Sequence, residues 1–420
     1  MSITAESATN QPLLTADGTP LKQSLQRSLR QSRMRALMLV GPPLLFLMVV
    51  FVVPIGDMLT RSVDDNLIND VMPRTIVAFD AWDKVSEPDE SMFKAVYEDL
   101  IAAEKTDRGK VSVRMNYAKP GWRSLIKRTT RKLKDMEAPY KEAFLAADKR
   151  WADEEFWLSF GIMKDRVTMG YYWNAVDKTF DFDKNVIDVA EERKVYNLLW
   201  WRTIQVSLIV TLACLLLAYP VAYLLATLPM RISNLLMICV LMPFWTSLLV
   251  RIVAWMIMLQ QNGVVNDTLV WSGLLDDENR LAMMYNFNGT IIVMTQILLP
   301  FMILPIYSVM KTIPPSYMKA AQNLGATPAL AFIRVYMPQT VPGIGAGCIL
   351  VFIVAIGYYI TPELVGGKDG RLIGNMVAYH MQRSLNWGLA AAMGTILLIV
   401  ILLLYWVYDK IVGIDNMKMG

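Results

Sequence analysis

The sequence has few of the residues that build metal centres. Its 420 residues include a single histidine, His380, and three cysteines, Cys214, Cys239 and Cys348. All three cysteines fall inside long apolar runs, so the polar stretches can hold neither a disulfide framework nor a zinc site. Because no second histidine or cysteine lies near His380, we interpret it as a polar boundary residue and predict no metal site.

Charged residues are also scarce, at 19% of the chain, and the net charge of +4 is too small to indicate nucleic-acid binding. The sequence contains no G-x-x-x-x-G-K-[ST], the loop that cradles nucleotide phosphates. Around Gly367 and Lys368, Pro362 stands in place of the first glycine and Asp369 in place of the hydroxyl residue. No catalytic triad or carboxylate pair is present, so we expect neither a catalytic residue nor a cofactor bound by this chain.

Apolar residues, in contrast, are abundant. They make up 55% of the chain, and the mean hydropathy is +0.36. They form runs long enough to cross a hydrocarbon layer about 30 Å thick, which takes about 20 helical residues each. We therefore predict an all-α polytopic membrane protein with about six transmembrane helices. The predicted spans are Met38–Leu59, Leu198–Leu225, Leu235–Leu259, Ile291–Ile313, Ile344–Ile360 and Leu389–Tyr408.

The N-terminal part is predicted to be a tail followed by the first span. Residues 1–35 are polar, and we expect a disordered cytoplasmic tail. The arginines before the first apolar run favour a cytoplasmic N-terminus by the positive-inside rule. The run is too long for the core of a cleaved signal peptide, and no A-x-A pattern follows it. Residues 36–60 are therefore expected to be an uncleaved transmembrane helix 1.

The composition changes abruptly over residues 61–197, which we interpret as a soluble periplasmic insert of domain size. Within it, Trp122–Trp157 lacks glycine and has apolar residues at helical spacings, so the insert is predicted to be mainly helical. A basic cluster comprises Arg123, Lys127, Arg128, Arg131, Lys132 and Lys134, and an acidic one comprises Asp148, Asp153, Glu154 and Glu155. We favour solvated helix faces; the alternative is a docking surface for a partner.

Residues 198–410 are predicted to carry transmembrane helices 2–6, followed by a cytoplasmic tail at residues 411–420. Arg251 lies at membrane depth, which is costly unless it faces the bundle interior, water or a partner. Gly343 and Gly347 form a G-x-x-x-G, which lets a second helix pack closely. Pro362 and the glycines after it are expected to break a helix near the outer boundary, with Glu363 at that break.

The segment 314–342 is a polar, helix-forming interruption between two apolar runs. Proline, threonine and glycine at specific positions predict two short helices separated by a left-handed residue. The expected order is a cap at Ser316, a helix over Tyr317–Leu324, a left-handed Gly325, a second cap at Thr327 with Pro328 after it, and helix stops at Pro338 and Pro342. Small residues between the two helices leave a low surface that another protein can approach.

This segment resembles the coupling loop of ABC-importer permeases, whose pattern is E-A-A, three residues, glycine, a spacer and proline. The matching positions are Ala320, Ala321, Gly325, Ala326, Phe332 and Pro338. In that family the loop docks into a groove of the cytoplasmic ATPase. Lys319 stands where the family usually has Glu, so any ion pair made at this position would change sign. The alternative is an ordinary turn between two membrane helices.

Several further segments resemble the spermidine/putrescine branch of these permeases. They are PFWTSLLVR, NGVVNDTL, LLPFMILPIY, PELVGG and LIGN, within the part of the chain from Trp200 to Tyr408. The resemblance also covers the first span but not the long insert. It implies a five-helix permease core in addition to the N-terminal span, with both termini in the cytoplasm and the chain in the bacterial inner membrane.

The resemblance also implies partners and a function. The expected partners are a second, homologous permease subunit, two ATPase subunits that bind ATP and Mg, and a periplasmic substrate-binding protein. The chain would be a non-catalytic subunit that translocates a polyamine-like cation. Candidates for the substrate path are Trp245, Arg251, Tyr358, Tyr359 and Glu363, each of which also has a structural interpretation. Two alternatives remain open: an importer of an opine, amino acid or organic anion, and a membrane scaffold or sensor that acts through the insert.

Overall fold

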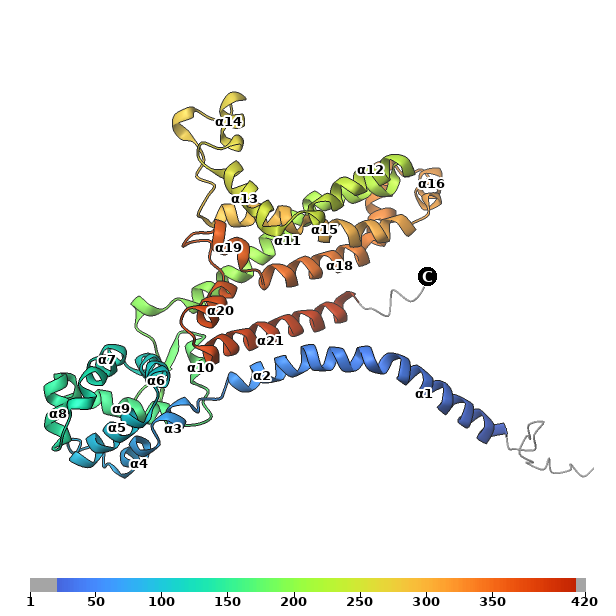
Figure 1. Ribbon diagram of the computed structural model, residues 1–420. Coiled ribbons are helices and arrows are strands. Elements are labelled where there is room, and N and C mark those ends of the chain that lie inside the picture. The colour runs from blue at the N-terminus through green and yellow to red at the C-terminus, as the bar shows by residue number, and fades with distance from the viewer. Residues whose placement is uncertain (1–20, 413–420) are drawn as a thin grey trace, which may run out of the picture. The chain divides into compact units, whose positions relative to one another are not determined.

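Figure 1 shows the computed structural model of the chain, which describes residues 21–412. Six of its helices are long and apolar enough to cross a membrane, which confirms the predicted all-α polytopic architecture. They are Leu29–Arg61, Tyr196–Thr227, Leu248–Trp271, Phe287–Thr312, Pro328–Ile356 and Trp387–Lys410. The chain divides into two compact units, with the boundary between Thr60 and Arg61.

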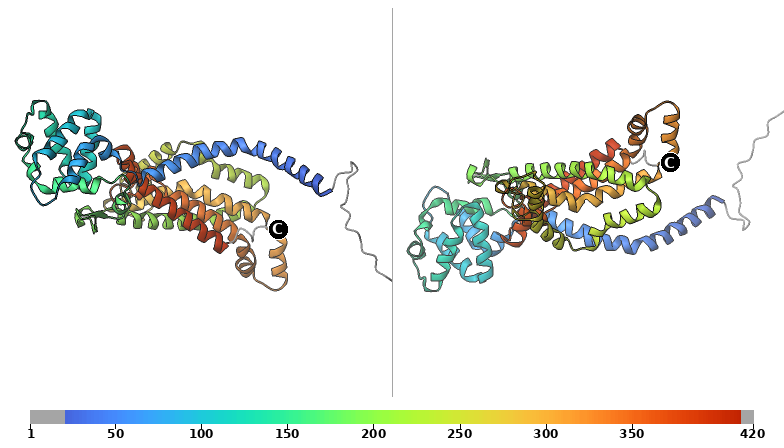
Figure 2. Two further views of the ribbon diagram at one scale, coloured as in Figure 1. Left: turned by 90° about the horizontal axis from the view of Figure 1, so that it is seen from below. Right: turned by 90° about the horizontal axis from the view of Figure 1, so that it is seen from above.

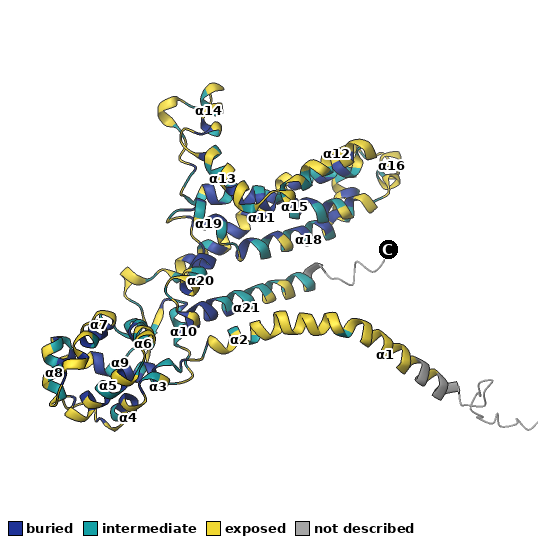
Figure 3. Ribbon diagram, in the orientation of Figure 1, coloured by how far each residue is buried: buried dark blue, intermediate teal, exposed yellow. Residues whose placement is uncertain are grey.

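The described part of the first unit is a long helix. It comprises α1 (Leu21–Leu47), a π-helical turn (Met48–Val52) and α2 (Val53–Arg61). Its described apolar side chains are exposed, apart from the half-buried Met58, as expected for a span that faces lipid (Figure 3). The prediction of a disordered tail over residues 1–35 is wrong for residues 21–35, because this stretch has no glycine or proline and is rich in helix formers. Residues 1–20 lie outside the described part of the chain.

The second unit begins with the insert, which is mainly helical as predicted. Its elements are α3 (Leu67–Val71), α4 (Pro73–Ala81), α5 (Glu90–Ala102), α6 (Lys105–Ala118), α7 (Trp122–Lys132), α8 (Tyr140–Ala147), α9 (Glu154–Met163), α10 (Gly170–Asn174), β1 (Lys178–Phe180) and β2 (Val186–Asp188). The two strands form an antiparallel hairpin with Thr179 opposite Ile187.

The insert has an aromatic core of its own. Trp122, Trp151 and Trp157 are fully buried, and their rings meet edge to face or tilted. Each indole N–H donates a hydrogen bond within 2.8–2.9 Å, to Ser159 Oγ, Thr129 Oγ1 and the Trp151 carbonyl oxygen respectively. Buried tryptophans contribute large apolar areas only when this donor is satisfied. The insert therefore has the core of a water-soluble domain.

The rest of the second unit is the helix bundle. Its helices are α11 (Tyr196–Thr227), α12 (Met230–Leu241), α13 (Leu248–Leu259), α14 (Val264–Trp271), α15 (Phe287–Thr312), α16 (Pro315–Asn323), α17 (Pro328–Ala331), α18 (Met337–Ile356), α19 (Ile360–Val365), α20 (Ile373–Gln382) and α21 (Trp387–Val412). Helices α11, α15 and α18 pack against one another and form its centre (Figure 2). Figures 1 and 2 place α16 and the insert at opposite ends of this unit.

The contact between α15 and α18 depends on glycine. A Cβ atom at Gly343 would lie 3.0 Å from the Pro305 carbonyl oxygen, and one at Gly347 would lie 2.7 Å from the Met302 sulfur. Both glycines are buried. The predicted role of this G-x-x-x-G as a close-packing surface is confirmed.

Two predicted boundaries are wrong. The expected continuous span Leu235–Leu259 is interrupted: α12 ends at Leu241, a 3₁₀ turn covers Met242–Trp245, and α13 begins at Leu248. Pro243 has no amide hydrogen to continue the α-helical ladder, and Thr246 adopts an extended conformation after the turn.

The second error concerns the fifth span, which was expected to start at Ile344 after stops at Pro338 and Pro342. Instead the helix runs from Pro328 to Ile356 through a π-helical turn over Phe332–Tyr336. A proline interrupts the regular hydrogen-bond ladder of a helix, and a π-helical turn is one of the forms in which a helix tolerates such an interruption. The short helix α17, the π-helical turn and α18 therefore form one continuous helical element.

The insert is fixed to the bundle at α10, α11 and α21. The Tyr171 ring lies directly against Gly388, where a Cβ atom would overlap it. The Tyr171 hydroxyl donates to the Asp65 carboxylate at 3.1 Å, and Arg114 Nε donates to the same oxygen at 2.8 Å. Asp177 accepts hydrogen bonds from three backbone N–H groups at the start of α11. The junction thus combines close packing with buried polar contacts.

Replacing Gly388 with Val should destabilise this junction. The new side chain would displace Tyr171 and disturb the Asp65–Arg114 pair, and overpacking of this kind typically costs about 1–3 kcal/mol. Thermal unfolding of the purified chain in detergent measures the effect. Gly109→Val is the matched control, because nothing lies within 4 Å of a Cβ atom there. Equal unfolding temperatures for the two variants would contradict the assignment.

Candidate functional site

The segment between α15 and α18 turns twice at one end of the bundle. Helix α16 ends at Asn323, and Gly325 follows with φ of +92°, the left-handed conformation predicted for it. Thr327 caps α17 by accepting a hydrogen bond from the Leu330 N–H, with Pro328 at the first helical position, also as predicted. The expected cap at Ser316 is wrong, because α16 already starts at Pro315 and places Ser316 inside the helix.

The small residues of this segment face open space. Lys319, Ala320 and Gly325 are exposed, and Ala321 and Ala326 are partly exposed. Leu324, between them, is 90% exposed, and nothing lies within 4 Å of a Cβ atom built at Gly325. Leu324 and the small residues around it are therefore open to close approach by another protein.

Phe332 has a different position from the small residues. Its ring stacks on Tyr336, with centroids 5.6 Å apart, and meets Tyr223 and Tyr219 of α11 edge to face at 5.2 and 6.2 Å. Phe332 therefore anchors the segment to α11 instead of facing a partner. The two α11 tyrosines were not predicted, because nothing in the local sequence shows that they lie beside Phe332, more than 100 residues away.

Four of the five candidates for the substrate path lie where α13 meets the break before α19. A helix break is present, but its predicted place is wrong: α18 ends at Ile356 and α19 begins at Ile360, so Pro362 and Glu363 lie inside α19. Arg251 lies on α13, which packs against α19, and Tyr358 lies in the break before α19. The buried Nε of Arg251 has no hydrogen-bond partner among the described residues. Arg251 therefore retains an unused donor at membrane depth.

Glu363 lies in the first turn of α19, just after this break. Its side chain is exposed, and Oε2 accepts a hydrogen bond from the Asn375 amide at 3.0 Å. The same amide donates to the Tyr359 carbonyl oxygen at 2.9 Å, which is the oxygen that also accepts from the Glu363 backbone N–H. Tyr359 is 41% exposed. Asn375 thus orients both residues, a role that the sequence did not predict although Asn375 belongs to the quoted LIGN segment.

Trp245, the fifth candidate, is separate from the other four. It ends the 3₁₀ turn before α13 and is 75% exposed. Within residues 21–412, no hydrogen bond or ring contact joins it to the residues around Glu363. Its exposure suits a contact with lipid or with a second chain.

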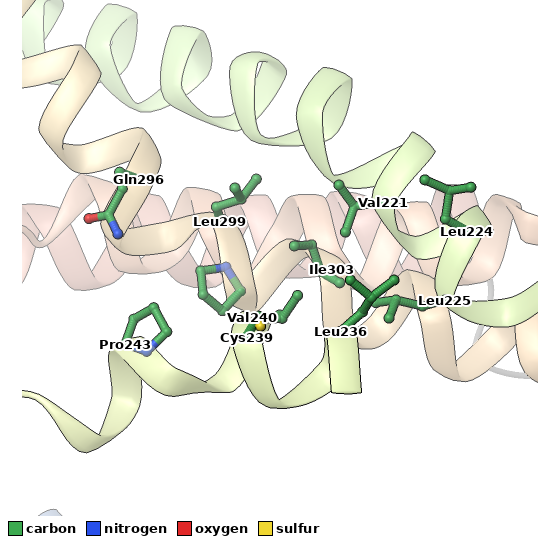
Figure 4. Close-up of a pocket in the computed structure, with 11 residues that line it drawn as sticks. Val221, Leu224, Leu225, Leu236, Cys239, Val240, Pro243, Gln296, Leu299 and Ile303 are labelled. Carbon is green, nitrogen blue, oxygen red and sulfur yellow. The ribbon is translucent and has the colours of Figure 1, made fainter. Parts of the chain in front are cut away.

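A cavity of about 390 Å³ lies between α11, α12 and α15 (Figure 4). Its walls are almost entirely apolar, formed by residues such as Leu225, Val240 and Ile303. Gln296 is the one amide in the lining, and its oxygen accepts a hydrogen bond from Trp255 Nε1 at 3.0 Å. A cavity without a charged group is unsuited to an ionic ligand, so it does not extend the predicted substrate path.

Known proteins resemble the bundle. The family model described as "Binding-protein-dependent transport system inner membrane component" matches residues 215–412. The spermidine/putrescine transport system permease protein PotB of Escherichia coli (strain K12) is 40% identical over 207 residues, which are 49% of this chain and 74% of that protein. The chain belongs to this family of transport permeases.

Two other relatives support the assignment of the permease. PotB of Haemophilus influenzae is 34% identical over 224 residues, covering 53% of this chain and 78% of the relative. The inner membrane ABC transporter permease protein YdcU of Escherichia coli is 32% identical over 272 residues, covering 60% and 86%. A chain in the crystal structure of a bacterial alginate ABC transporter in complex with an alginate-bound periplasmic protein is 18% identical, with a TM-score of 0.43 over 54% of this chain and 80% of that chain.

The chain is accordingly a multi-pass inner-membrane permease of an ABC importer. The predicted spans 2–6 correspond to the part of the chain that the family model covers, apart from the start of α11. The match begins within α11, so the family model does not include the insert.

The permease's only histidine lies in the junction between the insert and the bundle. His380, on α20, is buried, with Nε2 2.9 Å from the Tyr196 hydroxyl and Nδ1 2.8 Å from Ser384 Oγ. No group of three metal-ligating side chains is found among residues 21–412. Burial lowers the pKa of His380 to about 4, so the ring is neutral at pH 7 and acts as a structural hydrogen-bonding group.

His380 should make the stability of the permease depend on pH between about 6.5 and 4. In this window the unfolded chain binds a proton that the folded chain does not, so the free energy of unfolding falls as the pH is lowered, by up to about 3 kcal/mol. His380→Gln cannot titrate. The difference in unfolding temperature between the natural chain and this variant should therefore narrow from pH 7.5 to pH 4.5, and a constant difference would contradict the assignment.

Proposed function

We propose that this permease imports a small cation of the polyamine class, driven by a separate ATPase. The observation that supports it most directly is the 40% identity to a spermidine/putrescine permease over half of the chain. The exposed carboxylate of Glu363, oriented by Asn375 beside the aromatic side chain of Tyr359, is chemically suited to a cation. Carboxylates attract ammonium groups, and aromatic faces add about 0.5–2 kcal/mol of cation–π attraction.

The proposed assembly contains two ATPase subunits, a second permease subunit and a periplasmic binding protein. ATP and Mg would bind to the ATPases, since this chain has no nucleotide-binding loop. The end of the bundle that carries α16 would face the cytoplasm, because Arg231, Lys311, Lys319 and Arg334 gather in the segments at that end. With six spans, both termini would then be cytoplasmic and the insert periplasmic.

The proposed mechanism is alternating access. ATP binding would move the docked ATPases, which would displace α16 and the small residues after it. Phe332 would transmit this movement to α11 through Tyr219 and Tyr223, and the π-helical turn would transmit it directly to α18. ATP binding would drive this change of the bundle only if ATP bound more tightly to the assembly in one bundle conformation than in the other. Lys319 would pair with an acidic group on the ATPase, whereas the Glu usual in the family would pair with a basic group.

Gly325→Val tests the coupling role. Valine is strained in the left-handed conformation by about 1–2 kcal/mol, so the turn should shift. If this strain weakens docking of the ATPase by about the same 1–2 kcal/mol, uptake and the ATPase stimulation by the binding protein should fall about tenfold. Gly273→Val is the matched control, because Gly273 also has positive φ with nothing near its Cβ position but lies in the loop after α14. A scaffold or sensor would show no difference between the two variants.

Glu363→Gln tests the substrate class in proteoliposomes containing the full assembly. Loss of one charge-assisted contact, worth about 1.5 kcal/mol, should raise the putrescine or spermidine concentration for half-maximal uptake about tenfold. Glu278→Gln, which removes an exposed charge elsewhere, should have no effect.

A second candidate substrate is an organic anion, an amino acid or an opine, which the buried and unpaired Arg251 Nε favours. In that case Arg251→Gln, not Glu363→Gln, would impair uptake. The cognate binding protein would then gain thermal stability with an acidic ligand and not with polyamines, and that result would overturn the polyamine assignment.

A further inference from the structure

The insert contains a groove lined by positive charge. It lies between α6 and α7, has a volume of about 460 Å³, and is within the size range of small-molecule sites. Five of its lining residues are cationic: Lys105, Arg108, Arg123, Lys127 and Arg131. No acidic residue lines it. This is a concave site, unlike the solvated helix face expected from the sequence.

The spacing along α7 explains how the charges converge. Arg123, Lys127 and Arg131 are four residues apart, so they form one row on the helix. Arg128, on a different face of the same helix, pairs instead with Asp148 at 3.2 Å. The row on the groove side has no such partner: Arg123, Lys127 and Arg131 form no ion pair within the described chain, and neither does Lys105.

The acidic residue of α6 is engaged elsewhere. Asp107, on α6, pairs with Lys110 at 2.8 Å. Arg108 is held by backbone oxygens, with Nε donating to the Ala103 carbonyl at 2.9 Å. Its guanidinium is therefore fixed in position while its charge remains uncompensated. A cleft lined by one sign of charge focuses the electrostatic potential and raises the local concentration of oppositely charged ligands.

We infer that this groove binds a phosphate-bearing anion. Arginine guanidinium groups match phosphate oxygens in two-pronged geometry, and lysines add point charge. The hydroxyls of Ser112 and Thr130, also in the lining, donate to the Gly109 and Ile126 carbonyls, so the cationic side chains supply the donors for the anion. The same positive charge repels a cation, so the groove is separate from the proposed path of a polyamine. The inference does not depend on which substrate the permease carries.

A phosphate group at this site has two sources, a soluble phosphate compound or the headgroup of an anionic lipid. The full chain in phosphatidylcholine nanodiscs is titrated with pyrophosphate by calorimetry. In a second arm, native mass spectrometry counts the phosphatidylglycerol molecules that the chain retains from mixed lipid. Saturable binding in the first arm identifies a soluble ligand, and retention in the second arm alone identifies a headgroup. Added salt should weaken either interaction, since the groove is open to solvent.

The decisive variant is Arg123→Gln with Lys127→Gln, which removes two groove charges from exposed positions. The matched control is Lys134→Gln with Lys149→Gln, which removes two exposed charges outside the groove. The groove variant should bind at least about tenfold more weakly, and the control should bind as the natural chain does. Equal weakening in both variants, or no binding of either ligand by the natural chain, would overturn the inference. Equal unfolding temperatures establish that both variants are folded.

Discussion

The structure of the bundle depends on the need to satisfy every backbone hydrogen bond away from water. In hydrocarbon an unpaired N–H or C=O group costs several kcal/mol, so each apolar run becomes a helix. Interruptions are tolerated only in particular forms. The chain uses a 3₁₀ turn with Pro243 before α13, a π-helical turn over Phe332–Tyr336, and a break before α19, where the Tyr359 carbonyl accepts from both the Glu363 backbone N–H and the Asn375 side chain. All three interruptions lie beside candidate functional residues.

The insert and the bundle are stabilised in different ways. The insert buries tryptophans whose N–H groups are all hydrogen-bonded, a solution that relies on the hydrophobic effect in water. The bundle lacks that driving force between lipid-exposed helices and relies on close approach, for which α18 provides glycines against α15. The two regions meet at Tyr171 and Gly388, where an aromatic ring from the insert fits against a glycine of the bundle.

The sequence was sufficient to predict those features that depend on a residue and its near neighbours in the chain. The left-handed Gly325, the cap at Thr327 and the close-packing Gly347 each follow from the residue itself and its neighbours. It was insufficient where a distant segment decides the outcome. Pro338 reads as a helix stop but lies in a continuous helix, because the π-helical turn before it takes up the irregularity. The interactions of Phe332 with α11 and of Asn375 with Glu363 join segments that no local pattern connects.

Helix α11 has a consequence of its own. It is unbroken over 32 residues, about 48 Å, despite an internal proline. At one end Asp177 of the insert holds its first amides, and at the other its tyrosines hold Phe332. Because α11 is continuous and held at both ends, it couples these two sets of contacts. The segment around Gly325 and the base of the insert, which lie at opposite ends of the bundle, are thereby joined through a single helix.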